Sequence, residues 1–161
     1  MPRISFPDNG LEDYAGWMLS RPEIAAGMEA YSTAVYTRSQ LGVREREAAR
    51  YTIALVNDCK VCRAARAKHG DDAGLDEGFY AEVPNWRTST VLTGREALAA
   101  EFAQRFALDH QAMDDAFWAR LQAVFADDEI ADLTMCCAAW LGMGRAMAVI
   151  GVEAPRETLL V

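Results

Sequence analysis

The sequence predicts an all-α fold of about seven or eight helices. No stretch shows the alternation of apolar and polar residues that marks β-strands, and residues that favour helices (Ala, Leu, Glu, Arg and Met) dominate the chain. Signals for the start of a helix recur along it. With 161 residues, 52% of them hydrophobic, the chain can bury one core but not two, so we expect a single domain over residues 1–161.

Four helices are expected in the first 70 residues. After an extended arm over residues 1–10, they cover residues 11–19, 20–40, 43–56 and 59–70. Ser20 and Glu23 have the spacing of a capping box, in which each side chain accepts a backbone N–H at the start of the helix. Asn57 or Asp58 is expected to cap the fourth helix, which then begins with two cysteines.

The second half of the chain continues the helical pattern. Helices are expected over residues 71–79, from Thr93, from Asp114, and from a cap at Asp127 and Asp128 to about Ile150, with an arm after Gly151. Thr93 and Glu96 form a second capping box. Gly142 and Gly144 interrupt the longest helix and destabilise it by about 1 kcal/mol each relative to alanine. A close contact with another helix is therefore expected there.

The composition excludes two classes of partner. A formal net charge of -8 argues against nucleic acid and against an anionic membrane, because both require clustered cations.

The N-terminus has no apolar segment of signal-peptide length, and no apolar run approaches the roughly 20 residues of a membrane helix. We therefore expect a cytoplasmic protein, in which a Cys-x-x-Cys pair is catalytic or binds a metal rather than forming a structural disulfide.

Cys59 and Cys62 lie one helical turn apart at an expected helix start. The positive end of the helix dipole favours a thiolate there. Arg66, four residues after Cys62, adds a positive charge on the same face, whereas Asp58 opposes ionisation of Cys59. Cys62 is therefore the candidate nucleophile, and Cys59 is the resolving thiol that closes a disulfide with it.

Other interpretations of these residues stay open. The two cysteines could simply be small buried side chains. A structural zinc site would need four ligands, and the other two thiols, Cys136 and Cys137, are adjacent in an apolar helix where packing in the core is favoured. A carboxylate on the preceding helix, Glu47, could form a salt bridge with Arg44 or Arg50, which flank it at helical spacing.

Several motifs together resemble one family, that of alkylhydroperoxidase D (AhpD) and carboxymuconolactone decarboxylase. The matching motifs are Arg46-Glu47, twelve residues before Cys59; the turn Asn57-Asp58-Cys59, with Asp58 where the family has glycine; Cys59-x-x-Cys62; and Trp86 followed by Thr93-x-Arg95-Glu96. The resemblance covers about residues 40–150. It implies a multihelical AhpD-like bundle that assembles into trimers or hexamers.

The resemblance also implies a chemistry, namely peroxide reduction by a thiol pair with a proton relay from glutamate to histidine, without metal, flavin or haem. Carried over, Cys62 attacks the peroxide, Cys59 resolves the sulfenic acid and Glu47 takes part in proton transfer. The histidine of the family is replaced by Arg66, which cannot act as a base. His69 lies two turns from Cys62, roughly 10 Å along a helix. We predict that Glu47 and Arg66 pair with each other.

Three functions remain as hypotheses. The first is a peroxiredoxin-like alkylhydroperoxidase with a small peroxide as substrate and a thiol reductant as partner. The second is another member of the same fold, either a decarboxylase acting on a small carboxylated lactone or a catalytically silent homo-oligomer. The third is a helical interaction module in which the two thiols only sense redox state.

Overall fold

The computed structural model describes residues 2–6, 12–68 and 70–154, and these residues form eight α-helices and no β-strand. The helices are α1 (Asp13–Ser20), α2 (Pro22–Thr37), α3 (Val43–Val56), α4 (Lys60–Ala64), α5 (Glu77–Glu82), α6 (Gly94–Leu108), α7 (Asp115–Gln122) and α8 (Asp127–Ile150). Three short 3₁₀ helices cover Gly70–Ala73, Val83–Asn85 and His110–Ala112. The all-α prediction is confirmed.

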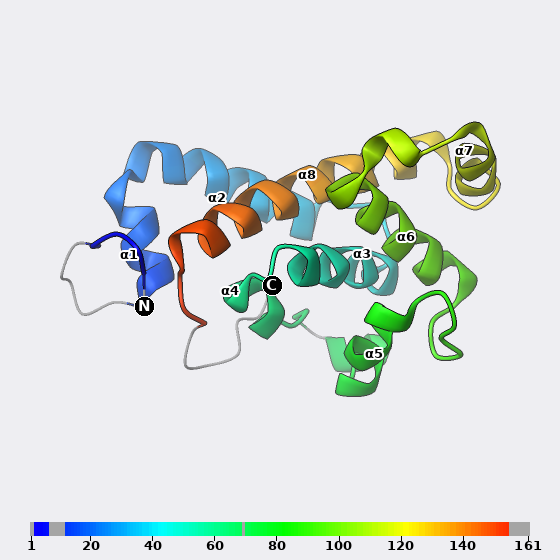
Figure 1. Cartoon of the computed structure of the whole chain (residues 1–161), viewed down its shortest axis with the longest axis horizontal. Coiled ribbons are helices and arrows are strands. Elements are labelled where there is room, and N and C mark those ends of the chain that lie inside the picture. Colours follow the sequence, from blue (N-terminus) through cyan, green and yellow to red (C-terminus); the bar gives the residue numbers. More distant parts are fainter. Residues whose placement is uncertain (1, 7–11, 69, 155–161) are drawn as a thin grey trace.

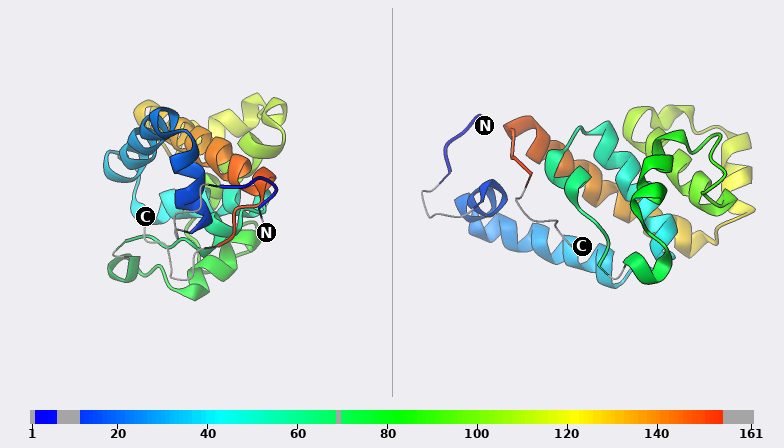
Figure 2. Two further views of the ribbon diagram at one scale, coloured as in Figure 1. Left: turned by 90° about the vertical axis from the view of Figure 1, so that its left-hand side faces the viewer. Right: turned by 90° about the horizontal axis from the view of Figure 1, so that it is seen from below.

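Helix α3 lies at the centre of the bundle (Figures 1 and 2). Its most extensive contacts are with α6, and α8 covers another of its sides. The side chains at this centre are small: Ala48 and Ala49 of α3 and Ala99, Ala100 and Ala103 of α6 are fully buried. Small side chains let two helix backbones approach closely. Half of α3 is buried, and its buried residues include the charged Glu47 and Arg50.

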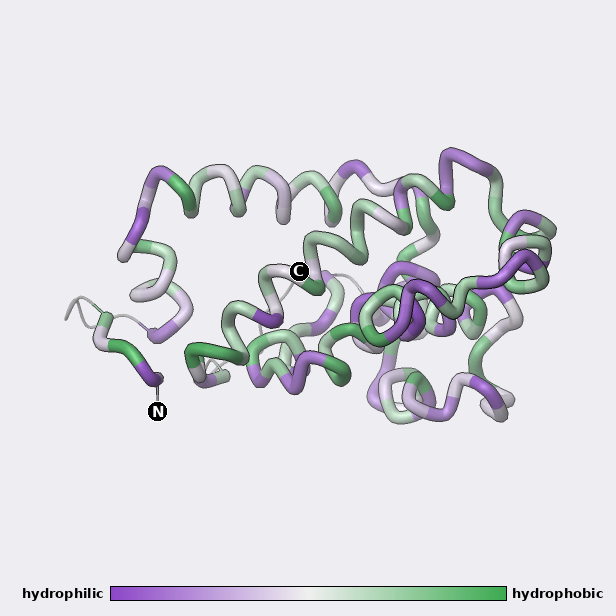
Figure 3. Tube along the Cα trace, turned by 45° about the horizontal axis from the view of Figure 1, so that its top comes forward, coloured by the Kyte–Doolittle hydropathy of each residue, from purple (hydrophilic) through white to green (hydrophobic). Residues whose placement is uncertain are grey.

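Hydrophilic and hydrophobic stretches alternate along the helices, as expected when each helix turns one face to the core (Figure 3). Helix α8 differs from the sequence expectation, because it is long and apolar enough to meet the criteria for a membrane span. Its four acidic residues lie in the first two turns, and the rest of the helix carries a single charge, that of Arg145. Leu133, Cys137 and Trp140 place it in the main core cluster with α3 and α6, and a core helix passes the same criteria.

One predicted capping box and one predicted helix start are confirmed. Thr93 and Glu96 form the capping box of α6: Thr93 Oγ1 accepts from Glu96 N at 3.2 Å and Glu96 Oε2 accepts from Thr93 N at 2.9 Å. Asp114 caps α7 by accepting the Phe117 N–H at 2.8 Å. These caps depend only on residues three positions apart, so the sequence is sufficient to predict them.

Other predicted boundaries are wrong. Ser20 does not cap α2, because its hydroxyl donates to Gly16 O at 2.9 Å and Arg21 occupies the N-cap. Ala126, not Asp127 or Asp128, is the N-cap of α8, and Glu129 accepts its backbone N–H at 2.9 Å.

The segment predicted as one helix over residues 71–79 is a 3₁₀ turn followed by α5, which Asp76 caps. Within the predicted N-terminal arm, Arg3 N donates to Ile150 O at 2.8 Å. Residues 7–10 of that arm, and the tail after residue 154, lie outside the described residues.

Candidate active site

The turn between α3 and α4 places the two cysteines. Asp58 adopts a left-handed conformation with φ 48°, which favours glycine and is tolerated by aspartate. This explains why glycine suits the same position in the motif that the chain resembles. Cys59 is the N-cap of α4, and its Sγ accepts the backbone N–H of Cys62 at 3.1 Å. The prediction that Asn57 or Asp58 caps this helix is therefore wrong.

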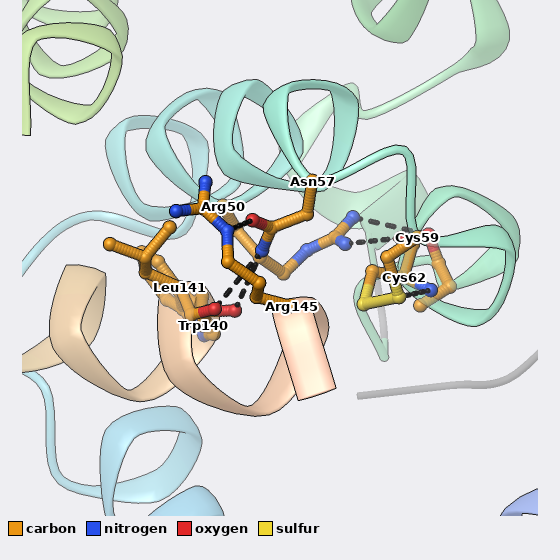
Figure 4. The surroundings of a disulfide bond; sticks show 8 residues. Arg50, Asn57, Cys59, Cys62, Trp140, Leu141 and Arg145 are labelled. Carbon is orange, nitrogen blue, oxygen red and sulfur yellow. Dashed lines mark hydrogen bonds between the residues drawn. A yellow bond between two sulfur atoms is a disulfide. The ribbon is translucent and has the colours of Figure 1, made fainter. Parts of the chain in front are cut away.

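Cys59 and Cys62 form a disulfide, with their Cα atoms 5.2 Å apart (Figure 4). The two sulfurs have different surroundings. Cys59 is fully buried in a small cluster with Val61, Met147 and Val152, whereas Cys62 is partly exposed and lines a cavity. An incoming molecule in this cavity therefore meets Cys62 and not Cys59.

Asn57 ties the turn to α8 (Figure 4). Its Nδ2 donates to the carbonyls of Trp140 and Leu141 at 3.4 and 3.2 Å, and its Oδ1 accepts from Arg145 Nε at 3.0 Å. Carbonyls inside a helix already accept one hydrogen bond, so these bonds use their second lone pairs. The result is a fixed distance between the cysteine turn and the middle of α8.

The two glycines of α8 differ. A Cβ added at Gly144 would lie 2.8 Å from Asn57 Nδ2 and 3.1 Å from Cys62 Sγ, whereas a Cβ at Gly142 would meet nothing within 4 Å. The predicted close contact is thus confirmed at Gly144, where the cysteine turn approaches α8, and is wrong for Gly142.

Glu47 and Arg50 form a buried ion pair on α3. Arg50 Nε and Nη2 each donate to a carboxylate oxygen of Glu47 at 2.8 Å, and the Tyr80 hydroxyl donates to Glu47 Oε2 at 2.9 Å. Burial opposes the charge of Arg50, but Glu47 more than compensates and raises the pKa of the guanidinium. Burial and the adjacent carboxylate raise the pKa of Tyr80 to about 12. The predicted partner Arg66 takes no part in this pair.

Arg50 also holds the end of α4. Its Nη1 donates to Cys62 O at 2.7 Å and its Nη2 to Ala65 O at 3.1 Å. These carbonyls belong to the last turn of a helix, where no backbone N–H is available to them. A buried cation on α3 therefore fixes the backbone of the nucleophile candidate itself (Figure 4).

Arg66 lies elsewhere, and the Glu47–Arg66 pairing is wrong. Helix α4 ends at Ala64 instead of Gly70, so Arg66 does not follow Cys62 along a helical face. Its Nε donates to Glu77 Oε1 at 2.7 Å, and its guanidinium lies 4.3 Å from the centre of the Tyr80 ring. It does not line the cavity. His69, the other accessory candidate, lies outside the described residues.

The cavity has a volume of about 340 Å³, within the range of about 300–1,000 Å³ for small-molecule sites. Helices α1, α2, α3, α4 and α8 all contribute to its walls, and its lining includes the side chains of Tyr14, Tyr36, Arg50, Cys62 and Trp140. Most of the lining is apolar.

The remaining thiols are separate from this cavity. Cys136 and Cys137 are free and fully buried, as predicted, and burial raises the pKa of Cys136 to about 12. Among the residues that the structure describes, no three His, Cys, Asp or Glu side chains are grouped to hold a metal ion. The zinc interpretation of the cysteines therefore has no ligand set there.

Sequence reasoning missed Tyr36, Tyr80 and Gly144 as neighbours of the site, and it treated Arg50 only as a surface partner of Glu47. The available signal was the spacing of Glu47 and Arg50, three residues apart on a helix with the small Ala48 and Ala49 between them. Two opposite charges on such a helix can be buried together. Nothing in the sequence indicates which tyrosines face the same cavity.

Comparison with known proteins supports the resemblance. Two uncharacterized proteins from two strains of Mycobacterium tuberculosis are each 29% identical over 132 residues, covering 76% of this chain and 46% of each relative, so the chain spans about half the length of the curated relatives it matches.

Among solved structures, a protein of unknown function from Agrobacterium tumefaciens, named for AhpD-type antioxidant defence, has a TM-score of 0.80 and 21% identity over 98% of this chain and 100% of that one. A peroxidase-related protein from Ralstonia eutropha has a TM-score of 0.74 and 20% identity over 92% of this chain and 79% of that one. These similarities establish the AhpD-like fold.

The family model for carboxymuconolactone decarboxylase matches residues 22–105, just over half of the chain. The chain therefore belongs to the carboxymuconolactone decarboxylase family.

Proposed function

We propose that this chain is a dithiol peroxidase that reduces an alkyl hydroperoxide at Cys62 and uses Cys59 as the resolving thiol. The observation that carries the proposal is the Cys59–Cys62 disulfide, in which one sulfur lies in the wall of a cavity and the other is fully buried. This asymmetry suits a cycling dithiol, because the peroxide must reach the nucleophile, whereas the resolving thiol has to reach only the sulfenic acid of Cys62.

The proposed cycle has three steps. The Cys62 thiolate attacks the terminal peroxide oxygen; an S–O bond forms, the O–O bond breaks, and the leaving oxygen takes a proton to become an alcohol. The Cys59 thiolate then attacks the sulfenic acid of Cys62, and hydroxide leaves as the S–S bond forms. A thiol reductant supplies two electrons and regenerates the dithiol by exchange, attacking Cys62 because Cys59 is buried.

Arg50 supports the thiolate in this proposal. Cys62 is the third residue of α4, near the positive end of a short helix, and Arg50 supplies a permanent charge beside it through the bond to Cys62 O. Glu47 is fully buried, has both carboxylate oxygens bonded, and does not line the cavity. We therefore propose that Glu47, predicted to transfer protons, acts by fixing Arg50.

The cavity gives less support to a decarboxylase for an acidic lactone. Such a substrate requires cations that converge on it. Within the described residues, Arg50 is the single cation of the cavity lining, and the lining also contains the acidic Glu29. An apolar hydroperoxide suits this lining better than a carboxylate does.

The proposal is tested by mixing reduced protein with tert-butyl hydroperoxide in a stopped-flow instrument. We expect the wild type to form one disulfide per chain, Cys59→Ser to stop at a sulfenic acid on Cys62, and Cys62→Ser to react no faster than an ordinary buried thiol. Cys136→Ser serves as a control and should react like the wild type. Equal, slow reactions of the wild type and Cys62→Ser would refute the peroxidase.

Homo-oligomerisation stays part of the proposal. Helix α2 buries only Val35 and exposes Ile24 and Tyr31, which is consistent with a surface that associates. The expected trimer or hexamer is tested by light scattering after size exclusion, and a monomer at micromolar concentration would contradict it.

A further inference from the structure

We propose, on the basis of the peroxidase function above, that Tyr36 is a catalytic residue that gives its phenolic proton to the leaving oxygen of the peroxide. The chain needs such a donor, because an alkoxide is a strong base and leaves slowly unless it is protonated. Arg66 occupies the position of the histidine in the related motif, and it pairs with Glu77 outside the cavity. We therefore infer that another side chain of the cavity lining supplies the proton.

Most polar groups of the lining cannot supply it. Arg50 does not release its proton, and the hydroxyls of Ser32, Thr33 and Thr37 are no more acidic than the alcohol that is formed. Glu29 is an exposed side chain on α2, and an ionised carboxylate only accepts hydrogen bonds. Two phenols remain, those of Tyr14 and Tyr36.

Tyr36 lines the same cavity as the reacting sulfur. Its ring centre is 6.4 Å from that of Trp140, and Trp140 and Gly144 lie four residues apart on one face of α8, about 6 Å along the axis. Gly144 in turn borders Cys62, because a Cβ there would lie 3.1 Å from Sγ. Tyr36 and Cys62 thus line the same cavity, and they lie beside residues of α8 that are four positions apart.

The charges around the two phenols differ. Burial raises the pKa of Tyr36 to about 12, so it is protonated at neutral pH; the nearby Arg50 favours its phenolate more than Glu47 opposes it. A phenol of this acidity is still a much stronger acid than the departing alcohol. Burial also raises the pKa of Tyr14, but there the neighbouring charge is Glu29, which further opposes a phenolate. Only at Tyr36 does a cation stabilise the product of proton donation.

The step balances as follows. The electron pair of the O–O bond moves to the leaving oxygen as Cys62 forms its S–O bond, and that oxygen takes the proton of Tyr36 and departs as the alcohol. The Tyr36 phenolate, held beside Arg50, recovers a proton from solvent before the next turnover. No metal or organic cofactor is needed in this step.

The test compares two peroxides whose leaving groups differ. tert-Butyl hydroperoxide expels an alkoxide and needs a proton donor, whereas peracetic acid expels acetate, a weak base that needs none. We expect Tyr36→Phe to oxidise about 100-fold more slowly than the wild type with tert-butyl hydroperoxide, and within about threefold of it with peracetic acid. Tyr31→Phe removes a phenol that does not line the cavity and should stay within about threefold with both, whereas Tyr14→Phe tests the competing phenol of the lining.

The outcomes separate the two proposals. If Tyr36→Phe matches the wild type with both peroxides, if it is slowed equally with both, or if Tyr14→Phe is slowed as much, Tyr36 is not the donor, although the peroxidase stands. If the wild type itself reacts no faster than Cys62→Ser with tert-butyl hydroperoxide, the peroxidase fails and the role of Tyr36 fails with it. A normal peracetic acid rate for Tyr36→Phe also establishes that the variant is folded.

Discussion

Replacing Gly144 by alanine tests the contact between α8 and the cysteine turn, and Gly142→Ala is its matched control. Both glycines lie in the interior of the same helix. Alanine in place of glycine stabilises a helix interior by about 1 kcal/mol. At Gly142 the added methyl meets nothing within 4 Å, so that variant should gain about 1 kcal/mol in its free energy of unfolding.

At Gly144 the same gain in helix stability is opposed by steric overlap of the added methyl with its neighbours. The methyl would lie 2.8 Å from Asn57 Nδ2 and 3.1 Å from Cys62 Sγ. Neither group can turn away easily, because Asn57 makes three hydrogen bonds and Cys62 is held in the disulfide. Overpacking of this kind destabilises by roughly 1–3 kcal/mol. We therefore expect Gly144→Ala to be less stable than Gly142→Ala by about 1–3 kcal/mol.

Urea denaturation of the two oxidised variants measures this difference, provided that the slope with denaturant is the same for both. The reaction of the reduced proteins with tert-butyl hydroperoxide adds a functional measurement. A displacement of Cys62 by even 1 Å can slow a positioned reaction by about 100-fold, whereas Gly142→Ala should react like the wild type. Equal gains in stability for both variants would refute the close contact at Gly144.

Three other predictions concern the turn and the surroundings of the ion pair. Asp58→Gly should be more stable than Asp58→Ala by about 1 kcal/mol. Both variants lose the salt bridge to Arg63, but of the two new residues only glycine suits a φ of 48°. Equal denaturation midpoints of the two variants would contradict this. Arg66→His should change the peroxide rate by less than about threefold, because Arg66 does not line the cavity. It should change stability by less than about 1 kcal/mol, because Glu77 in the ion pair is mostly exposed. A large gain in rate would instead support a histidine relay at this position. Between pH 10 and 12 the wild type should lose stability by up to about 1.4 kcal/mol per pH unit through Tyr80. The reason is that the unfolded chain releases the phenolic proton near pH 10, whereas the folded chain keeps it to about pH 12. In thermal unfolding over this range, Tyr80→Phe should lose less stability than the wild type by this amount.

The elements that the sequence predicts correctly are those decided locally. Helix propensity gives the all-α class, and the caps at Thr93 and Asp114 follow from side chains three residues from their partners. The same rule fails at Ser20 because Pro22 suits the first helical position, which moves the cap to Arg21 and leaves the Ser20 hydroxyl to bond back to α1. Local rules do not choose between two overlapping helix starts.

The wrong prediction for Arg66 has a different cause. Residues 60–68 favour a helix by propensity, so the sequence gives no reason for α4 to stop at Ala64. The stop is tertiary. Ala65 takes an extended conformation, and Arg50, from the preceding helix, donates to the carbonyls of Cys62 and Ala65. A helix end fixed by a buried side chain twelve to fifteen residues earlier cannot be predicted from local patterns.

The same arginine connects the fold to the chemistry. A buried guanidinium is tolerated only when it is paired and its hydrogen bonds are made, and Glu47 and the two carbonyls at the end of α4 meet both requirements. Removing Glu47 would therefore leave the charge of Arg50 without its partner and loosen the backbone of Cys62, even though Glu47 is not in the cavity. The carboxylate and the thiols can thus depend on each other without a proton passing between them. On our proposal the missing histidine is no defect, because Arg50 supports the thiolate with a fixed charge and Tyr36 supplies the proton.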